Sequence, residues 1–243
     1  MKKLYGFMAL ALCTLVNIYA ANIGLLIVAT GKYINFVEPL INSAKQHFCA
    51  NHHVTYFVFT DDRLPLMDNV VVIPQDRLGW PYDTLMRFAM YYNQKDMLQS
   101  MDYLYACDSD MLFTDTVGDE ILGERVATQS PGYIGRRGTY ETRPYSTAYV
   151  GRHEGKQYFA GGFYGGTTQE FLQLLAQVTA NIQIDLQRKI IAAWHDESHL
   201  NRYFIDHEPT VILSGSYCYP GKLIKPYPKK LWALEKDHTE YRK

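Results

Sequence analysis

The chain has 243 residues, of which 47% are hydrophobic, so it is long enough to bury one sizeable core. Its 24 basic and 25 acidic residues give a formal net charge of −1, and no basic stripe is present, which argues against nucleic-acid binding. The 20 tyrosines and 3 tryptophans fit an aromatic core, and they also fit a surface that packs against the C–H faces of sugars.

An apolar leader begins the chain. Met1-Lys2-Lys3 precedes an almost wholly apolar run from residue 4 to residue 20. This pattern predicts a secretory signal peptide within residues 1–21, and an uncleaved membrane anchor is the alternative. We therefore expect a membrane-associated or secretory-pathway protein, with a non-translocated helix on a cytoplasmic protein as the third interpretation.

Strand and helix patterns alternate after the leader. Continuous apolar runs predict strands at 23–30, 54–60, 70–73 and 103–107, and helical spacing predicts helices at 33–48 and 84–100. This alternation indicates an α/β fold with a largely parallel central sheet flanked by helices. Ligands of such sheets bind at the carboxyl ends of the strands.

The second half of the chain is less regular. Residues 132–149 predict a substrate-facing loop, and residues 160–166 form a glycine-rich core segment without the spacing of a dinucleotide loop or a P-loop. Helices are predicted at 168–191 and 192–205. The tail at 222–243 is basic and aromatic without apolar periodicity, so we expect it to be mobile without ligand.

Two carboxylates follow the strand predicted at 103–107. In extended backbone Asp108 and Asp110 point to the same side, while Ser109 turns away. Two oxygen ligands at a strand end suit Mn²⁺ or Mg²⁺, which keep open positions for substrate phosphates. The alternative is a solvated turn after the strand.

A second polar cluster lies in the helix predicted at 192–205. His195 and His199 would share a helical face, but Asp196 stands where a zinc metalloprotease needs glutamate, so a structural histidine pair is favoured. Glu197 is a candidate nucleophile, general base or electrostatic stabiliser beside Trp194, and a structural salt bridge is the alternative.

The cysteines predict neither a zinc site nor a dense disulfide framework, because no CxxC spacing occurs. The four are Cys13, Cys49, Cys107 and Cys218. A bridge between Cys49 and Cys218 stays open as an alternative.

Several segments match one known family together. They are residues 56–61, 102–111, 117–122, 143–144 with 148–149, 161–166, and Trp194-His195-Asp196-Glu197-Ser198-His199-Leu200-Asn201. On these residues the chain beyond the leader resembles glycosyltransferase family 6, the family of the blood-group A and B transferases, α-1,3-galactosyltransferase, Forssman synthase and bacterial relatives. The last segment is the hallmark of that family.

The resemblance implies a GT-A fold, with a Rossmann-like mixed sheet, over a catalytic domain at residues 22–243. It implies a retaining α-1,3-glycosyltransferase that moves N-acetylgalactosamine or galactose from a UDP-sugar to a galactose-terminated glycan, fucosylated or not. The alternatives are a UDP-galactose-specific α-1,3-galactosyltransferase and an inactive carbohydrate-binding member. A metal-dependent hydrolase built on the His195 and His199 helix is a third interpretation, which the missing HExxH order disfavours.

The resemblance also implies roles for individual residues. Glu197 matches the catalytic carboxylate, and Asp108 and Asp110 match the DxD motif that holds Mn²⁺, with Mg²⁺ as the alternative. The implied donor and nucleotide contacts are Val28, Ala29, Tyr33, Arg87, Asp108, Ser109, Asp110, Ala160, Gly161, Gly162, Lys236 and Arg242, and the implied sugar and acceptor contacts are Trp194, His195 and Asp196.

The resemblance also bears on substrate choice. It implies that residues 160–162 lie against the C2 substituent of the donor sugar, where small residues leave room for an N-acetyl group and favour UDP-N-acetylgalactosamine. An acceptor-binding histidine of the blood-group enzymes aligns with Ser130, and an acidic acceptor contact within 214–220 is replaced, so the acceptor is not carried over.

Overall fold

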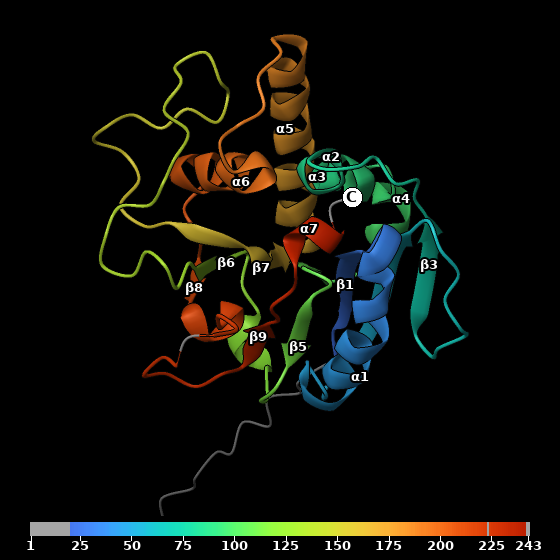
Figure 1. Cartoon of the computed structure of the whole chain (residues 1–243). Coiled ribbons are helices and arrows are strands. Elements are labelled where there is room, and N and C mark those ends of the chain that lie inside the picture. The colour runs from blue at the N-terminus through green and yellow to red at the C-terminus, as the bar shows by residue number, and fades with distance from the viewer. Residues whose placement is uncertain (1–19, 223, 242–243) are drawn as a thin grey trace, which may run out of the picture.

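A seven-stranded sheet in the order β3-β2-β1-β4-β7-β6-β8 runs through the protein (Figure 1). The computed structural model describes residues 20–222 and 224–241. Within these residues β7 alone runs antiparallel to its neighbours in this sheet, so the predicted mixed, mostly parallel α/β arrangement is confirmed. The strands are β1 (Asn22–Val28), β2 (His53–Thr60), β3 (Val70–Pro74), β4 (Tyr103–Cys107), β6 (Arg125–Gln129), β7 (Phe159–Thr167) and β8 (Val211–Leu213).

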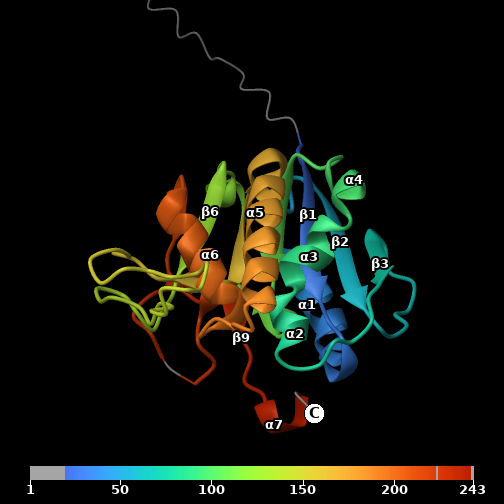
Figure 2. The ribbon, with the colours of Figure 1, turned by 90° about the horizontal axis from the view of Figure 1, so that it is seen from above.

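Helices cover both faces of the sheet (Figure 2). One face packs on α1 (Val37–His47), and the other packs on α3 (Arg87–Tyr92), α5 (Thr168–Gln187) and α6 (His195–Asp206). The remaining described helices are η1 (Gly31–Phe36), α2 (Tyr82–Leu85), α4 (Lys95–Leu98), η2 (Asp119–Ile121), η3 (Gly215–Cys218) and α7 (His238–Tyr241). A small second sheet pairs β5 (Met111–Phe113) with β9 (Leu231–Ala233).

The two faces of the sheet correspond to two hydrophobic clusters. Leu25 and Ile27 of β1 belong to the cluster that contains α1, whereas Leu26 between them belongs to the cluster that contains α3, α5 and α6. This alternation follows from the two-residue period of a strand. All three side chains are fully buried, which explains why the run is continuously apolar.

The single helix predicted at 84–100 is wrong. The structure has α2, α3 and α4 there, separated at Met86 and Gln94, whose ψ angles of 5° and 15° depart from the α-helical region. The apolar spacing was nevertheless informative, because Leu85, Phe88 and Leu98 are buried. The chain therefore buries the expected side chains by turning at each break instead of continuing as a straight helix.

Other details also differ from the prediction. The helix expected at 168–191 ends earlier, at Gln187. The helix expected at 33–48 begins as the 3-10 helix η1 and becomes α-helical at Val37. The helix expected at 192–205 begins at His195, so Trp194 precedes it. The tail, which shows no apolar periodicity, contributes β9 and α7, and α7 lies beyond the ends toward which β1 and β2 point (Figure 2).

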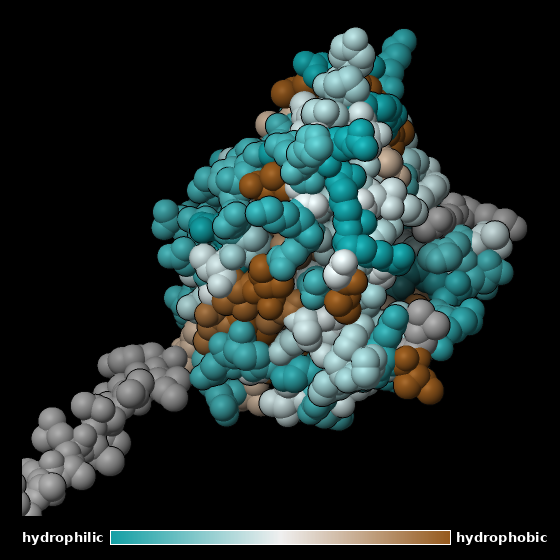
Figure 3. Space-filling model, turned by 90° about the vertical axis from the view of Figure 1, so that its left-hand side faces the viewer, coloured by the Kyte–Doolittle hydropathy of each residue, from teal (hydrophilic) through white to brown (hydrophobic). Residues whose placement is uncertain are grey.

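The segment between β6 and β7, residues 130–158, is a long loop that contains the loop predicted at 132–149, and it extends beside α6 (Figure 1). From the side of the molecule that carries it, most of the surface is hydrophilic, with one larger hydrophobic patch and several small ones (Figure 3). Inside the loop, Tyr158 packs against Tyr133 and Tyr140, with ring centroids 4.8 and 5.1 Å away.

The leader prediction lies mostly outside the described residues. In the part of the chain that the structure describes, no helix is long and apolar enough to cross a membrane. Cys49, Cys107 and Cys218 are free thiols, so the alternative of a bridge between Cys49 and Cys218 is wrong.

Candidate active site

Opposite strand directions bring the acidic pair and the glycine-rich segment to one edge of the sheet. β7 runs antiparallel to β4, so that Cys107, the last residue of β4, lies opposite Phe163. The N–H of Asp108 then donates to the carbonyl of Gly162 at 2.9 Å. Because β1 and β2 run parallel to β4, their carboxyl ends reach the same edge.

Two adjoining cavities open at this edge, with volumes of about 260 and 160 Å³. Thr84, Arg87 and Asp108 line both of them. The larger one is also lined by residues of β1, η1, the acidic pair and the tail, including Val28, Tyr33, Ser109, Asp110 and Lys236. The smaller one is also lined by Gly161, Gly162, Trp194, His195, Asp196 and Glu197.

Arg87 joins the two cavities. Its Nη1 donates to Asp108 Oδ1 at 2.7 Å and to the Gly161 carbonyl at 3.2 Å. Its Nε lies 3.0 Å from Asp196 Oδ2, although the N–H is not aligned for a hydrogen bond. Burial opposes the charge of Arg87, but Asp196 and Asp108 outweigh it and raise its pKa. One cation therefore contacts Asp108, which lines both cavities, and Asp196, which lines the smaller one.

Asp196 is the buried partner of Arg87 in the first turn of α6. Its side chain is 5% exposed. Burial raises its pKa to about 7, and the positive charge of Arg87 opposes that rise. Acidic residues at a helix N-terminus are stabilised by the helix dipole, which favours this position for Asp196 and Glu197.

Glu197 is held against the start of β7. The N–H of Gly161 donates to Glu197 Oε2 at 2.7 Å. Burial raises the pKa of Glu197, and the hydrogen bond from Gly161 opposes that rise. A Cβ at position 161 would lie 3.4 Å from Glu197 Oε2, so glycine keeps this face of the carboxylate uncovered. The geometry is that of a fixed anion facing the smaller cavity.

The tail closes on the larger cavity through Lys236. Its ammonium forms an ion pair with Asp110, and it lies 5.0 Å from the centre of the Tyr33 ring. Burial raises the pKa of Asp110, as does Asp108, while Lys236 opposes both. The Asp110 carbonyl also accepts a hydrogen bond from the N–H of Leu234 at 2.8 Å, which fixes where the tail crosses the site.

Two aromatic side chains border the smaller cavity. The Trp194 residue is 49% exposed, and its backbone N–H donates to Ser198 Oγ at 2.9 Å. His195 has a φ of 46°, a left-handed conformation that is uncommon for a residue other than glycine. Its ring meets Trp80 edge to face at 4.7 Å. An exposed ring beside buried carboxylates suits a sugar, whose apolar face packs on aromatics.

The structure brings most of the predicted site residues together, while their roles stay predictions. Ala29 and Ala160 are buried just behind the cavity walls, 0% and 6% exposed, and they line neither cavity. Ser109, expected to turn away, lines the larger cavity beside both aspartates. Arg242 lies outside the described residues.

Sequence reasoning missed several lining residues, among them Trp80, Thr84 and His238. Trp80 sits in a Gly-Trp-Pro turn, where an exposed aromatic residue is a usable signal of binding. Thr84 lies three positions before Arg87, a spacing that points to one helical face. No local pattern marks His238, because the long-range fold of the tail places it.

The paired histidines do not form a metal centre. His199 is 2% exposed, with its Nε2 3.8 Å from Asp185 Oδ2, and burial lowers its pKa to about 4. His195 instead borders the cavity, because its positive φ takes it out of helical geometry. Among the described residues no cluster of three or more histidine, cysteine, aspartate or glutamate side chains could hold a metal ion.

The chain is similar to several characterised glycosyltransferases. The histo-blood group ABO system transferase 1 of Rattus norvegicus is 38% identical over 215 residues, which cover 83% of this chain and 62% of the rat protein. The globoside alpha-1,3-N-acetylgalactosaminyltransferase 1 of Canis lupus familiaris is 35% identical over 222 residues, 86% of this chain and 63% of the dog protein. The O-antigen biosynthesis glycosyltransferase WbnI of Escherichia coli is 29% identical over 227 residues, 90% of this chain and 97% of the bacterial protein.

These matches cover less than two thirds of the length of the rat and dog proteins. The sequence profile of glycosyltransferase family 6 matches residues 12–242, which is nearly the whole chain. The mixed, mostly parallel sheet flanked by helices agrees with that match. The chain belongs to glycosyltransferase family 6.

Proposed function

We propose that this protein is a retaining α-1,3-glycosyltransferase that moves N-acetylgalactosamine, or alternatively galactose, from a UDP-sugar to a galactose-terminated glycan. The observation that carries the proposal is the meeting of Asp108, Arg87 and Glu197 around two joined cavities. The larger cavity takes the nucleotide and diphosphate, and the smaller one takes the transferred sugar. Membership of family 6 supports this division.

The chemistry of the larger cavity fits a diphosphate. Val28 and Tyr33 offer an apolar and aromatic wall for the uridine, and Lys236 offers a cation within reach of the acidic pair. Oxygen donors from Asp108 and Asp110 are the type that Mn²⁺ and Mg²⁺ accept, and two of them leave positions for phosphate oxygens. When bound, the metal ion would neutralise charge on the leaving UDP.

The smaller cavity fits the reacting sugar. Glu197 offers a buried anion where positive charge develops at the anomeric carbon, and it acts as nucleophile or as electrostatic stabiliser. The Gly161 N–H holds one of its oxygens in place. Trp194, His195 and Asp196 bind the donor sugar and the acceptor galactoside around it.

Measuring UDP release from UDP-sugars, with and without a galactoside acceptor, tests this proposal. A transferase releases UDP faster with acceptor and forms an α-1,3 product. An inactive carbohydrate-binding member binds sugar without UDP release, and a hydrolase shows no acceptor dependence. Either of the last two results would contradict the proposal.

We expect UDP-N-acetylgalactosamine to be preferred over UDP-galactose. Gly162 leaves space at the wall of the sugar cavity, and such space discriminates by only ~1–3 kcal/mol for a small group. In Gly162→Ala the new Cβ would lie 3.3 Å from Cys218 Sγ and Met111 Sδ and 3.5 Å from Asp108 Oδ2, so it would crowd a carboxylate that lines the sugar cavity. The ratio of kcat/KM for the two donors should therefore move toward galactose in the variant. A wild-type preference for UDP-galactose would overturn this expectation.

Removing the tail after Leu234 should severely weaken use of the UDP-sugar while leaving the fold intact. The deletion removes Lys236 and α7, which packs on η1 through Tyr241 and Tyr33 with ring centroids 5.3 Å apart. It keeps β9 and its pairing with β5. The measurement is donor KM together with the melting temperature.

A point variant and a control distinguish the contribution of the Lys236 ammonium to donor binding from that of the rest of the tail. Lys236→Met should reproduce most of the loss, because it removes only the ammonium beside Asp110. Glu240→Gln should leave donor KM unchanged, because Glu240 forms an exposed ion pair with Lys32. Near-normal donor affinity in the truncated protein would argue against a closing tail.

A further inference from the structure

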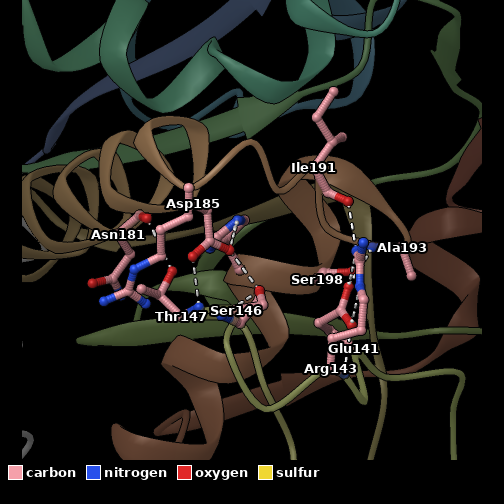
Figure 4. A network of polar contacts seen from close by, with 12 residues as sticks. Glu141, Arg143, Ser146, Thr147, Asn181, Asp185, Ile191, Ala193 and Ser198 are labelled. Carbon is pink, nitrogen blue, oxygen red and sulfur yellow. Dashed lines mark hydrogen bonds and ion pairs between the residues drawn. The ribbon is translucent and has the colours of Figure 1, made fainter.

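Two buried carboxylates, Asp185 and Glu141, take part in tying the long loop between β6 and β7 to the helical layer (Figure 4). The first is Asp185 of α5, whose carboxylate accepts hydrogen bonds from Ser146 Oγ at 2.5 Å and from the N–H of Thr147 at 2.7 Å. Asp185 is 1% exposed. This tie anchors the outer part of the loop to the C-terminal half of α5.

The second tie is a buried carboxylate that accepts four hydrogen bonds (Figure 4). Glu141 Oε1 accepts from the N–H of Arg143 at 2.8 Å and from its Nε at 2.9 Å. Glu141 Oε2 accepts from Arg143 Nη2 at 2.6 Å and from the N–H of Ala193 at 2.9 Å. Arg143 Nη2 also donates to the carbonyl of Ile191 at 2.6 Å. We call Glu141 and Arg143 the clamp.

The Glu141 carboxylate of the clamp is buried and fully hydrogen-bonded. Glu141 is 2% exposed, and burial alone would raise its pKa, but the hydrogen bonds from Arg143 and Ala193 lower it to about 2. A buried carboxylate with all its acceptor positions in use is held in one geometry, and a two-point contact with arginine adds direction to that hold.

The clamp holds the connection between α5 and α6, which leads to the residues that line the sugar cavity. Residues 188–194 join α5 to α6 without regular structure, and Ala193 immediately precedes Trp194 and His195. His195 adopts a φ of 46°, which persists only where the surrounding contacts over-determine the backbone. The contacts of the clamp to Ile191 and Ala193 are among the contacts that constrain the backbone just before this residue, together with the hydrogen bonds from the N–H of His195 to the Ala192 carbonyl and from the backbone N–H of Trp194 to Ser198.

We propose that Glu141 and Arg143 are positioning residues for the sugar side of the active site. They fix the 191–195 turn, and through it they set where Trp194 and His195 stand against the bound sugars. We expect the nucleotide side of the site to depend little on the clamp, because it is built by β1, η1, the 80–87 segment, the end of β4 and the tail, whereas the clamp bonds to Ile191 and Ala193. The expected effect of the clamp on sugar transfer rests on the proposed function, whereas its expected effect on the conformation of the turn does not.

Glu141→Gln is the leading test. A glutamine has one acceptor oxygen and one NH₂ donor group. Two of the four N–H groups that donate to Glu141 would therefore face the NH₂ group, which cannot accept them. We expect a loss of roughly 10- to 100-fold in kcat/KM for the acceptor, from the weakening of hydrogen bonds to a charged group. The Kd for UDP should stay within about twofold, since distant sites act independently.

Arg143→Lys is the second variant, and it guards against misfolding. The Arg143 side chain is 51% exposed, so the lysine is accommodated, but a single ammonium cannot bridge both Glu141 oxygens and the Ile191 carbonyl. The control is Glu170→Gln. Glu170 Oε2 accepts from Arg125 Nη1 at 2.7 Å, so it is also a carboxylate–arginine pair, but it lies in the first turn of α5, at the opposite end of that helix from the clamped turn. This control should leave both readouts unchanged.

Amide hydrogen exchange of residues 190–198 tests the positioning directly, without any need for turnover. Exchange there should accelerate in both clamp variants and stay unchanged in the control. The inference is overturned if exchange in this segment is unaffected, if UDP binding falls in parallel with transfer, or if Glu170→Gln has the same effect. If the wild type transfers no sugar, the proposed function fails, while the exchange experiment still decides on the clamp.

Discussion

Replacing Glu197 with glutamine is expected to reduce the rate of sugar transfer by about 100- to 1000-fold, the usual cost of losing a preorganised charge partner. Glutamine keeps an oxygen that can accept from the Gly161 N–H, so the local geometry survives while the negative charge is lost. The Kd for UDP should change little, because Glu197 lines the sugar cavity and not the nucleotide cavity. Single-turnover transfer and UDP titration on the same preparation measure the two effects.

A second glutamate provides the matched control. Glu170 of α5 is also partly buried and hydrogen-bonded, with its Oε2 2.7 Å from Arg125 Nη1, but it lines neither cavity. Glu170→Gln should therefore transfer sugar at the wild-type rate. An unchanged rate in Glu197→Gln would refute the catalytic assignment, and an equal loss in both variants would point to a general effect of removing helix charges.

Chelation with EDTA is expected to abolish transfer, and excess Mn²⁺ is expected to restore it. Asp108 and Asp110 line one cavity at the end of β4, and an ion held between them and the diphosphate would stabilise charge on the leaving UDP. Arg87 and Lys236 pair with these carboxylates but cannot replace a dication with several open positions.

Asp110→Asn sharpens the metal test. It should raise the Mn²⁺ concentration needed for half-maximal activity, because it removes one anionic ligand. A binding readout complements the rate: Mn²⁺ should tighten UDP binding to the wild type more than to the variant. Full activity in EDTA would place the chain among enzymes that work without metal and would reject the proposed role of the acidic pair.

The layered α/β arrangement was predictable because the burial of each strand shows in its own run of apolar residues. The run at β1 is continuously apolar because both of its faces are covered, and the acidic pair interrupts such a run where β4 ends. The prediction of one helix at 84–100 was wrong because apolar spacing shows burial but not the path of the backbone. Apolar spacing reports which side chains are buried, and it does not report that the backbone turns at Met86 and Gln94 between them.

The sequence by itself determined the class of fold, the position of the acidic pair at a strand end, and the family through its combined motifs. Only the tertiary structure decided which distant residues meet: Lys236 reaches Asp110 across 126 positions, and Glu141 reaches Ala193 across 52. Periodicity is a property of neighbours in the chain, whereas these contacts depend on strand order, on the antiparallel direction of β7 and on the return of the tail along β5. The clamp and the contact of Lys236 with Asp110 therefore could not be predicted from local patterns, although local patterns predicted the fold that contains them.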